Sequence, residues 1–150
     1  MIRFVVKSDS SSSSSGELEY HGHPGDLYIN LKGDSNAYGA LTDAQKIGHE
    51  FEHGSQFLDG LLGFTNITGK WQGYRDDLVD EGNAFIAGFE AESVGASQGK
   101  FLNDIQRAAN SGGVNAVVNV LSQEGPYRGR STQQIPITTI TPSIYAVPRH

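Results

Sequence analysis

The chain has no cysteine among its 150 residues, which excludes disulfide bonds, thiolate metal ligands and a cysteine nucleophile. Positive charge is also scarce, because 11 lysines and arginines stand against 17 aspartates and glutamates and the formal net charge is -6. Proteins that bind nucleic acids usually present a basic face, so we expect no nucleic-acid partner.

Long hydrophobic runs are absent as well. No apolar segment approaches the roughly 20 residues that a membrane-spanning helix needs, so we expect no membrane partner. The apolar run after Met1 is too short for a signal peptide, and we expect a cytoplasmic protein, or one that is exported by another route or cut from a longer chain. The length of 150 residues predicts one domain, residues 1–150, and the low hydrophobic content of 37% with 19 glycines predicts many turns and loops.

The sequence does contain the pattern His49-Glu50-x-x-His53. On a helix, positions i and i+4 share one face at about 6 Å, so both imidazoles can reach one Zn²⁺ at about 2.0–2.1 Å. Glu50 follows the first of these ligands and can take a proton from a water that the metal activates. The pattern has only three specified residues, and the alternative is a solvated helix face rich in His and Glu.

The residues around this pattern favour a helix. Thr42 and Gln45 form a capping box at its start, and Gly60 is expected to end it. Gly48 and Gly54 each cost about 1 kcal/mol relative to alanine, which a close neighbour of the helix backbone would explain. We expect the helix to pack through an apolar stripe, formed by Ile47, Phe51 and Leu58.

A second helix is expected at residues 77–92, with Asp77 as its cap. Its buried stripe contains Leu78, Phe85 and Phe89, and Glu81 lies in the same row. A buried carboxylate is costly unless it is paired or bound to a metal, so Glu81 is the candidate third zinc ligand. The alternative is a first-turn glutamate that the helix dipole stabilises. The other acidic residues are expected to point to the sides, namely Asp80, Glu90 and Glu92.

The fold class is expected to be α+β, a small and mainly antiparallel sheet followed by a helical metal-binding half. Strands are predicted at residues 2–7, 17–20 and 26–32, the first two as a candidate hairpin around a flexible Ser-rich loop at 8–16. The third strand is a candidate edge strand, which could pair with an extended peptide.

Residues 60–76 connect the two main helices and are expected to cover part of the site, with turns at Gly63, Gly69 and Gly73. A hydrolytic site needs a donor for the oxyanion, and Tyr74 is the candidate. Tyr38 and Tyr127 are alternatives, and for each tyrosine a packing or surface role stays open. Two short helices are expected at 101–109 and 114–121, followed by an extended tail over 125–150.

At these motifs the chain resembles the zincin metallopeptidases of the gluzincin type, which carry HExxH on one helix and a glutamate on the next. The segment from His49 to Gln56 resembles the HExxHxxQ variant of compact bacterial zincins. The segment from Glu81 to Ala87 is similar to the E-A-N-x-F-A segment of a bacterial regulatory metallopeptidase family. Short zincin domains of this kind also occur as toxins at the C-termini of bacterial polymorphic and Rhs-type effectors.

The resemblance implies that His49, His53 and Glu81 bind Zn²⁺, and that Glu50 is the general base and then carries the proton to the leaving amine. A His₂Glu set with a neighbouring glutamate base favours zinc over iron, and the spacing alone leaves other divalent metals open. The expected substrate is a protein or peptide, and a toxin would also have an immunity or regulatory protein as its partner. Two alternatives stay open, a non-catalytic metal-binding or structural interaction domain and a regulatory protease of one intracellular target.

Overall fold

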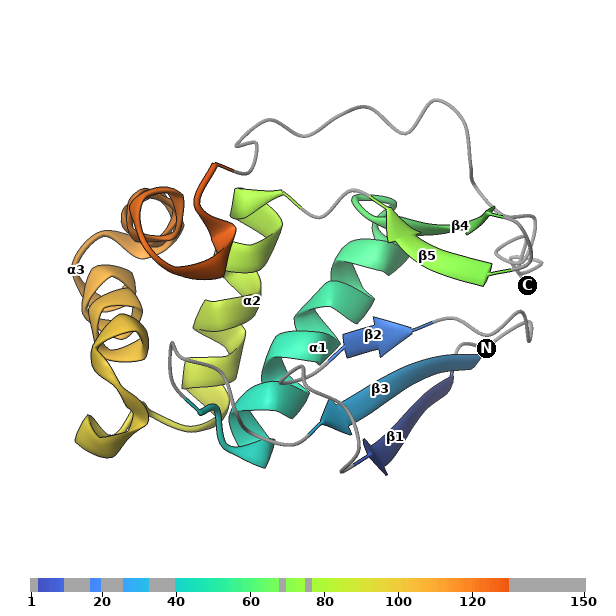
Figure 1. The fold of residues 1–150 in the computed structure, drawn as a ribbon, viewed down its shortest axis with the longest axis horizontal. Coiled ribbons are helices and arrows are strands. Elements are labelled where there is room, and N and C mark those ends of the chain that lie inside the picture. The colour runs from blue at the N-terminus through green and yellow to red at the C-terminus, as the bar shows by residue number, and fades with distance from the viewer. Residues whose placement is uncertain are drawn as a thin grey trace.

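The computed structural model describes residues 3–9, 17–19, 26–32, 40–67, 70–74 and 77–129. Helix α1 (Asp43–Leu58) lies between a small sheet and helix α2 (Leu78–Ala91), and α3 (Lys100–Gln123) covers the far side of α2 (Figure 1). The α+β fold class is therefore confirmed. None of the helices in these ranges is long and apolar enough to cross a membrane.

The N-terminal sheet contains β1 (Arg3–Asp9), β2 (Glu17–Glu19) and β3 (Asp26–Lys32) in the order β1-β3-β2. β1 and β3 are parallel along their whole length, and only β2 is antiparallel to β3. The expected mainly antiparallel sheet is therefore wrong in its longest pairing, and β1 and β2 form no hairpin. β3 is central rather than an edge strand. The alternation of side chains sets which residues face the core but not the direction of the partner strand.

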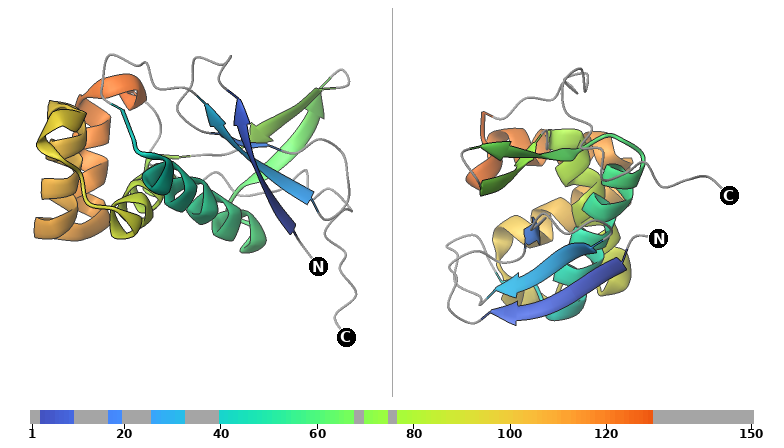
Figure 2. Two further views of the ribbon diagram at one scale, coloured as in Figure 1. Left: turned by 90° about the horizontal axis from the view of Figure 1, so that it is seen from below. Right: turned by 90° about the vertical axis from the view of Figure 1, so that its right-hand side faces the viewer.

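β3 is central because it carries the apolar residues that α1 covers (Figure 2). Leu27 and Ile29 are buried on it, and the alternation of side chains along a strand turns Tyr28, which lies between them, to the other face. Arg3 and Asp26 are opposite each other in this parallel pair, and the guanidinium of Arg3 donates to both carboxylate oxygens of Asp26 at 3.0 and 2.8 Å.

The connection between α1 and α2 contains a second, two-stranded sheet that the sequence did not reveal. β4 (Gly63–Ile67) and β5 (Lys70–Tyr74) pair antiparallel, and β5 also contacts β2. Gly63 and Gly73 lie within these strands rather than at turns, because each pairs with a residue of the opposite strand. The glycines that suggested a loop therefore belong to a hairpin.

The ends of α1 follow the sequence signals. Gln45 N–H donates to Thr42 Oγ1 at 3.2 Å, and Thr42 N–H donates to Gln45 Oε1 at 2.9 Å, which is the expected capping box. The helix ends at Leu58, two residues before Gly60, whose φ of 78° is left-handed. In α2, Asp77 Oδ1 accepts hydrogen bonds from the first-turn N–H groups of Val79 and Asp80, as its cap position predicts.

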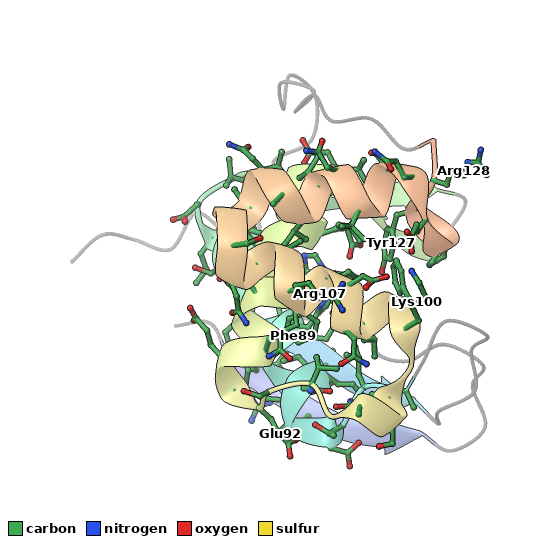
Figure 3. All side chains as sticks on the ribbon, turned by 90° about the vertical axis from the view of Figure 1, so that its left-hand side faces the viewer. Phe89, Glu92, Lys100, Arg107, Tyr127 and Arg128 are labelled. Carbon is green, nitrogen blue, oxygen red and sulfur yellow. The ribbon has the colours of Figure 1, made fainter. Side chains whose placement is uncertain are left out.

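The main core lies between α2 and α3. Leu78, Phe85 and Phe89 of α2 are buried as expected. Their partners come chiefly from α3, namely Phe101, Leu102, Ile105, Val117 and Leu121. Lys100 and Arg107 remain on the outer face of α3 (Figure 3). The sequence therefore located the α2 stripe correctly.

α3 is two helical segments joined at Gly113, whose φ of 61° and ψ of -153° are not helical. This kink agrees with the two short helices expected there. The chain then makes a short turn of 3₁₀-helix at Gly125–Tyr127, so the expected extended tail is wrong at its start. β1 likewise continues through residues 8 and 9, where a loop was expected, whereas residues 10–16 and 130–150 lie outside the described ranges.

Candidate metal centre

The buried face of α1 is polar, which contradicts the apolar stripe expected for this helix. Phe51 and Leu58 are 41% and 56% exposed. Apart from Gly54 and Phe57, the residues of α1 that are buried share hydrogen-bonding or ionisable side chains, namely Gln45, Lys46, His49, Glu50, His53 and Gln56. Most helices bury apolar side chains, and polar groups in such positions must be compensated by specific partners. The inner face of α1 therefore has the composition of a site.

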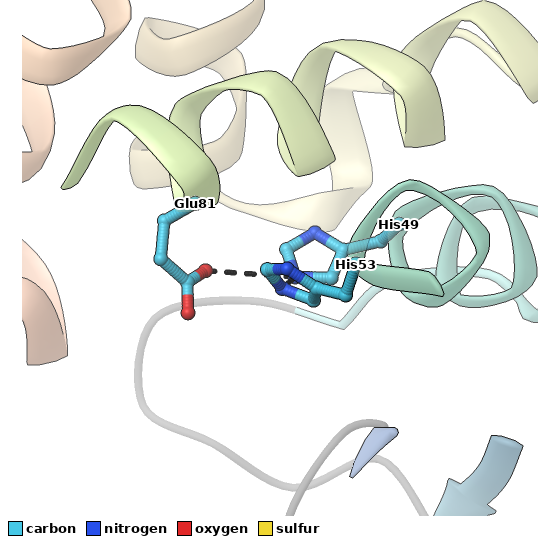
Figure 4. A group of neighbouring side chains, drawn as sticks. All are labelled: His49, His53 and Glu81. Atoms are coloured by element: carbon cyan, nitrogen blue, oxygen red, sulfur yellow. Dashed lines mark hydrogen bonds and ion pairs between the residues drawn. The ribbon is translucent and has the colours of Figure 1, made fainter. Parts of the chain in front are cut away.

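Two histidines of α1 and one glutamate of α2 meet on this face. His49, His53 and Glu81 are 6%, 7% and 5% exposed, and one ligand atom of each lies within 4.8 Å of the other two. His49 Nε2 is 3.2 Å from His53 Nε2 and 3.5 Å from Glu81 Oε2. Figure 4 shows the carboxylate of Glu81 facing the two imidazoles across the helix pair. The two helices thus bring together the three residues that the sequence singled out as ligands.

The separations of these atoms fit a small metal ion. Donor atoms in tetrahedral coordination, with bonds of about 2.0–2.1 Å, are about 3.3–3.4 Å apart. The distances of 3.2 and 3.5 Å from His49 Nε2 lie on either side of this value. Two imidazole nitrogens and a carboxylate are also ligands that zinc accepts in catalytic sites. The third separation, between His53 and Glu81, lies within 4.8 Å, so the three residues form a candidate site for one ion.

Close packing of α1 on α2 makes this approach possible. A methyl group at Gly88 would lie 2.7 Å from the backbone oxygen of Gln45, and one at Gly48 would lie 2.9 Å from that of Ala87. Real side chains do not come so near to backbone, so both positions require glycine. The close neighbour expected for Gly48 is α2, and that for Gly54 is the ring of Phe4.

Each histidine has a further neighbour that orients its ring. His49 packs edge-on against Phe85, with ring centroids 4.8 Å apart and an interplanar angle of 79°. His53 Nδ1 is 2.8 Å from Gln56 Oε1. Ligand histidines in metal sites usually donate their second ring N–H to such an acceptor. The sequence pattern contained Gln56, but its contact with His53 needed the structure.

The acidic residues near the site differ in burial. Glu50, the proposed base, is 5% exposed on the same helix as the two histidines. Asp80 is 1% exposed, so the expectation that it lies at the side of α2 is wrong. It lies in one row with Ala84 and Gly88, two small residues whose spacing could have indicated a second buried face. Glu90 is exposed, as expected.

Of the three candidate oxyanion donors, the structure describes the side chain of Tyr127 alone. The backbone of Tyr74 ends β5, but its side chain lies outside the described residues, as does the whole of Tyr38. Tyr127 packs edge-on against Phe85, with ring centroids 5.8 Å apart and an interplanar angle of 85°. This contact gives Tyr127 a packing role beside the ring that supports His49.

Comparison with known proteins gives no family for this chain. No protein-family model matches the sequence, no curated protein matches it, and no solved structure matches the fold at a significant level. Functional inference therefore starts from the site itself.

Proposed function

We propose that this protein is a zinc-dependent metallopeptidase with His49, His53 and Glu81 as metal ligands. The observation that carries the proposal is the buried His-His-Glu group, whose ligand atoms lie within 4.8 Å of one another on two facing helices. A surface cluster of acidic residues would carry little weight, but these three side chains are almost fully buried where apolar residues would pack at lower cost. The group also leaves coordination positions for a water and a substrate, as catalytic zinc sites do.

Zinc in such a site acts as a Lewis acid that makes water and a peptide carbonyl reactive near neutral pH. Glu50 would accept the proton of the attacking water as the oxygen–carbon bond forms. It would then give that proton to the amide nitrogen as the carbon–nitrogen bond breaks, so that the products are a carboxylate and an amine. His49 and His53 would hold the ion while neutral, and Glu81 would supply one negative charge to it.

Glu50→Gln tests the catalytic part of the proposal. The substitution keeps size and hydrogen bonding but removes the base, so we expect the protein to retain about one zinc per chain and to lose cleavage by roughly 10²–10⁴-fold. Glu52→Gln is the matched control, because Glu52 is on the same helix but is only partly buried. It should cleave like the parent. Substrates can be found by incubating cell lysate with the protein and sequencing the new peptide termini.

The outcomes separate three interpretations. Equal cleavage by Glu50→Gln and the parent would refute the mechanism. Zinc without cleavage in lysates from several sources would favour a non-catalytic metal-binding domain. A chain that takes up no stoichiometric zinc after reloading would refute the metal site altogether. The effector and regulatory interpretations differ in the substrate, which these variants do not identify, so both stay predictions.

A further inference from the structure

Gln56 connects one candidate ligand to the helix that carries another. It is buried, at 2% exposure, one helical turn after His53. Its Oε1 lies 2.8 Å from His53 Nδ1, and its Nε2 donates to the backbone oxygen of Asp80 at 2.9 Å. Asp80 immediately precedes Glu81 in α2. One side-chain amide therefore touches both halves of the candidate metal centre.

The contact with Asp80 determines which way the amide faces. A backbone oxygen can only accept a hydrogen bond, so the NH₂ group of Gln56 must face Asp80 and its oxygen must face His53. The opposite orientation would place two acceptors 2.9 Å apart in a site that water barely reaches. The amide oxygen in turn needs a donor, and its partner among the described residues is His53 Nδ1, which can donate when it carries the ring proton.

The position of this proton determines what the other ring nitrogen can do. In a neutral imidazole with the proton on Nδ1, Nε2 carries a free lone pair. His53 Nε2 is the atom that lies 3.2 Å from His49 Nε2, among the candidate ligand atoms. Without the contact from Gln56, a neutral His53 could carry its proton on Nε2 and would then be unable to bind a metal.

We propose that Gln56 is a positioning residue that keeps the proton of His53 on Nδ1 and thereby prepares Nε2 for zinc. The hydrogen bond to Asp80 also fixes His53 at a set distance from the segment of α2 that carries Glu81. This inference rests on the proposed metal site for its purpose, but the proton position can be measured without any metal.

The test uses ¹⁵N NMR of the full-length chain after chelation, at an alkaline pH where imidazole is neutral. Long-range correlations within the ring distinguish a protonated from an unprotonated nitrogen. In the parent we expect His53 to carry its proton on Nδ1 only. In Gln56→Met, which keeps the bulk but removes both hydrogen bonds, we expect a mixture that includes the Nε2-protonated form. Gln56→Glu keeps an acceptor beside Nδ1 and should retain the Nδ1 form.

Zinc affinity, measured by competition with a chelating dye, provides the second readout. Loss of an outer partner of a ligand weakens metal binding by roughly 10–100-fold, which we expect for Gln56→Met. Gln45→Met is the matched control, because Gln45 is equally buried on α1 but bonds Thr42 and residues after α2. It should lower stability, while the His53 proton and the zinc affinity stay as in the parent.

The results distinguish this inference from the proposed function. If His53 keeps its proton on Nδ1 in Gln56→Met, or if Gln45→Met weakens zinc binding equally, Gln56 has only a structural role. If the parent binds no zinc but the proton moves in Gln56→Met, the proposed function fails and the effect of Gln56 on His53 stands. If Gln56→Met does not fold, a mixed proton position in Gln56→Glu refutes the inference and an Nδ1 proton supports it.

Discussion

Replacing Glu81 by glutamine should remove most of the stability that zinc gives to the fold. Glu81 Oε2 lies 3.5 Å from His49 Nε2 and is one of three donors that can share the ion. Glutamine keeps the size of the side chain but offers a neutral, weaker ligand. Loss of an outer partner already weakens metal binding by up to about 100-fold, and loss of a direct ligand should do at least that.

The expected size of the effect follows from binding linkage. With free zinc at about 100 times the Kd of the parent, binding stabilises the folded chain by about 2.7 kcal/mol. For a chain of this size, 1 kcal/mol moves the melting temperature by roughly 2–4 °C, so zinc should raise it by about 5–11 °C. At the same zinc concentration, a 100-fold weaker Glu81→Gln keeps only about 0.4 kcal/mol, or about 1–2 °C.

Thermal melts followed by circular dichroism, with zinc and with chelator, measure both shifts. Glu90→Gln is the matched control, because Glu90 is on the same helix but exposed, and it should show the full shift. An undiminished shift in Glu81→Gln would refute the ligand assignment. If Asp80→Asn lost the shift instead, the third ligand would be the neighbouring buried carboxylate, and the two-histidine part of the site would stand.

Three further predictions concern the packing, the capping and the charge pairs of the helices. Gly88→Ala should lower the free energy of unfolding by about 1–3 kcal/mol and weaken zinc binding, because the new methyl group would meet α1. Gly95→Ala is the control in the same melts and titrations, because a methyl group there would make only ordinary van der Waals contacts. Asp77→Ala removes the α2 cap and should cost about 1 kcal/mol in urea unfolding. The hydrogen bond from Lys100 holds the pKa of Asp104 below its ordinary value, so the pair contributes stability above the pKa of the unfolded carboxyl and loses it as the pH falls through the folded pKa. Asp104→Asn should lack this contribution, so its melting temperature should depend less on pH in the acid range than that of the parent. Melting temperatures measured over an acid pH series test this, and equal pH dependence of the two proteins would contradict it.

The parts of the fold that local signals determine were predictable from the sequence. The caps at Thr42 and Asp77 depend on a few neighbouring residues, and the stripe of α2 depends on its 3.6-residue period. Strand pairing was not predictable, because the direction of β1 against β3 depends on the path of residues between them. Glycines also misled the interpretation, since those in β4 and β5 pair within a hairpin.

The candidate site was predictable as a set of ligands but not as a packed structure. The HExxH spacing places His49 and His53 on one face of any helix, and the stripe of α2 contains Glu81. Whether the two faces meet depends on how closely α1 approaches α2. That approach is set by Gly48 and Gly88, whose role becomes visible only when the opposite backbone is known.

The inner face of α1 contains both glycines and buried ionisable groups. Each of these two features would weaken a helix pair whose role was only structural. Glycine within a helix costs about 1 kcal/mol relative to alanine, and buried ionisable groups often cost more than apolar residues of similar volume. Some of the polar groups have structural partners, since Gln45 completes a cap and Lys46 lies 3.4 Å from Asp43 Oδ1. His49 and His53 add ionisable groups that helix packing does not need, because leucines there would pack α1 against α2 without any desolvation of polar atoms. The proposed metal ion would account for both features at once, since it would bind the buried donors and require the short distance between helices that the glycines allow.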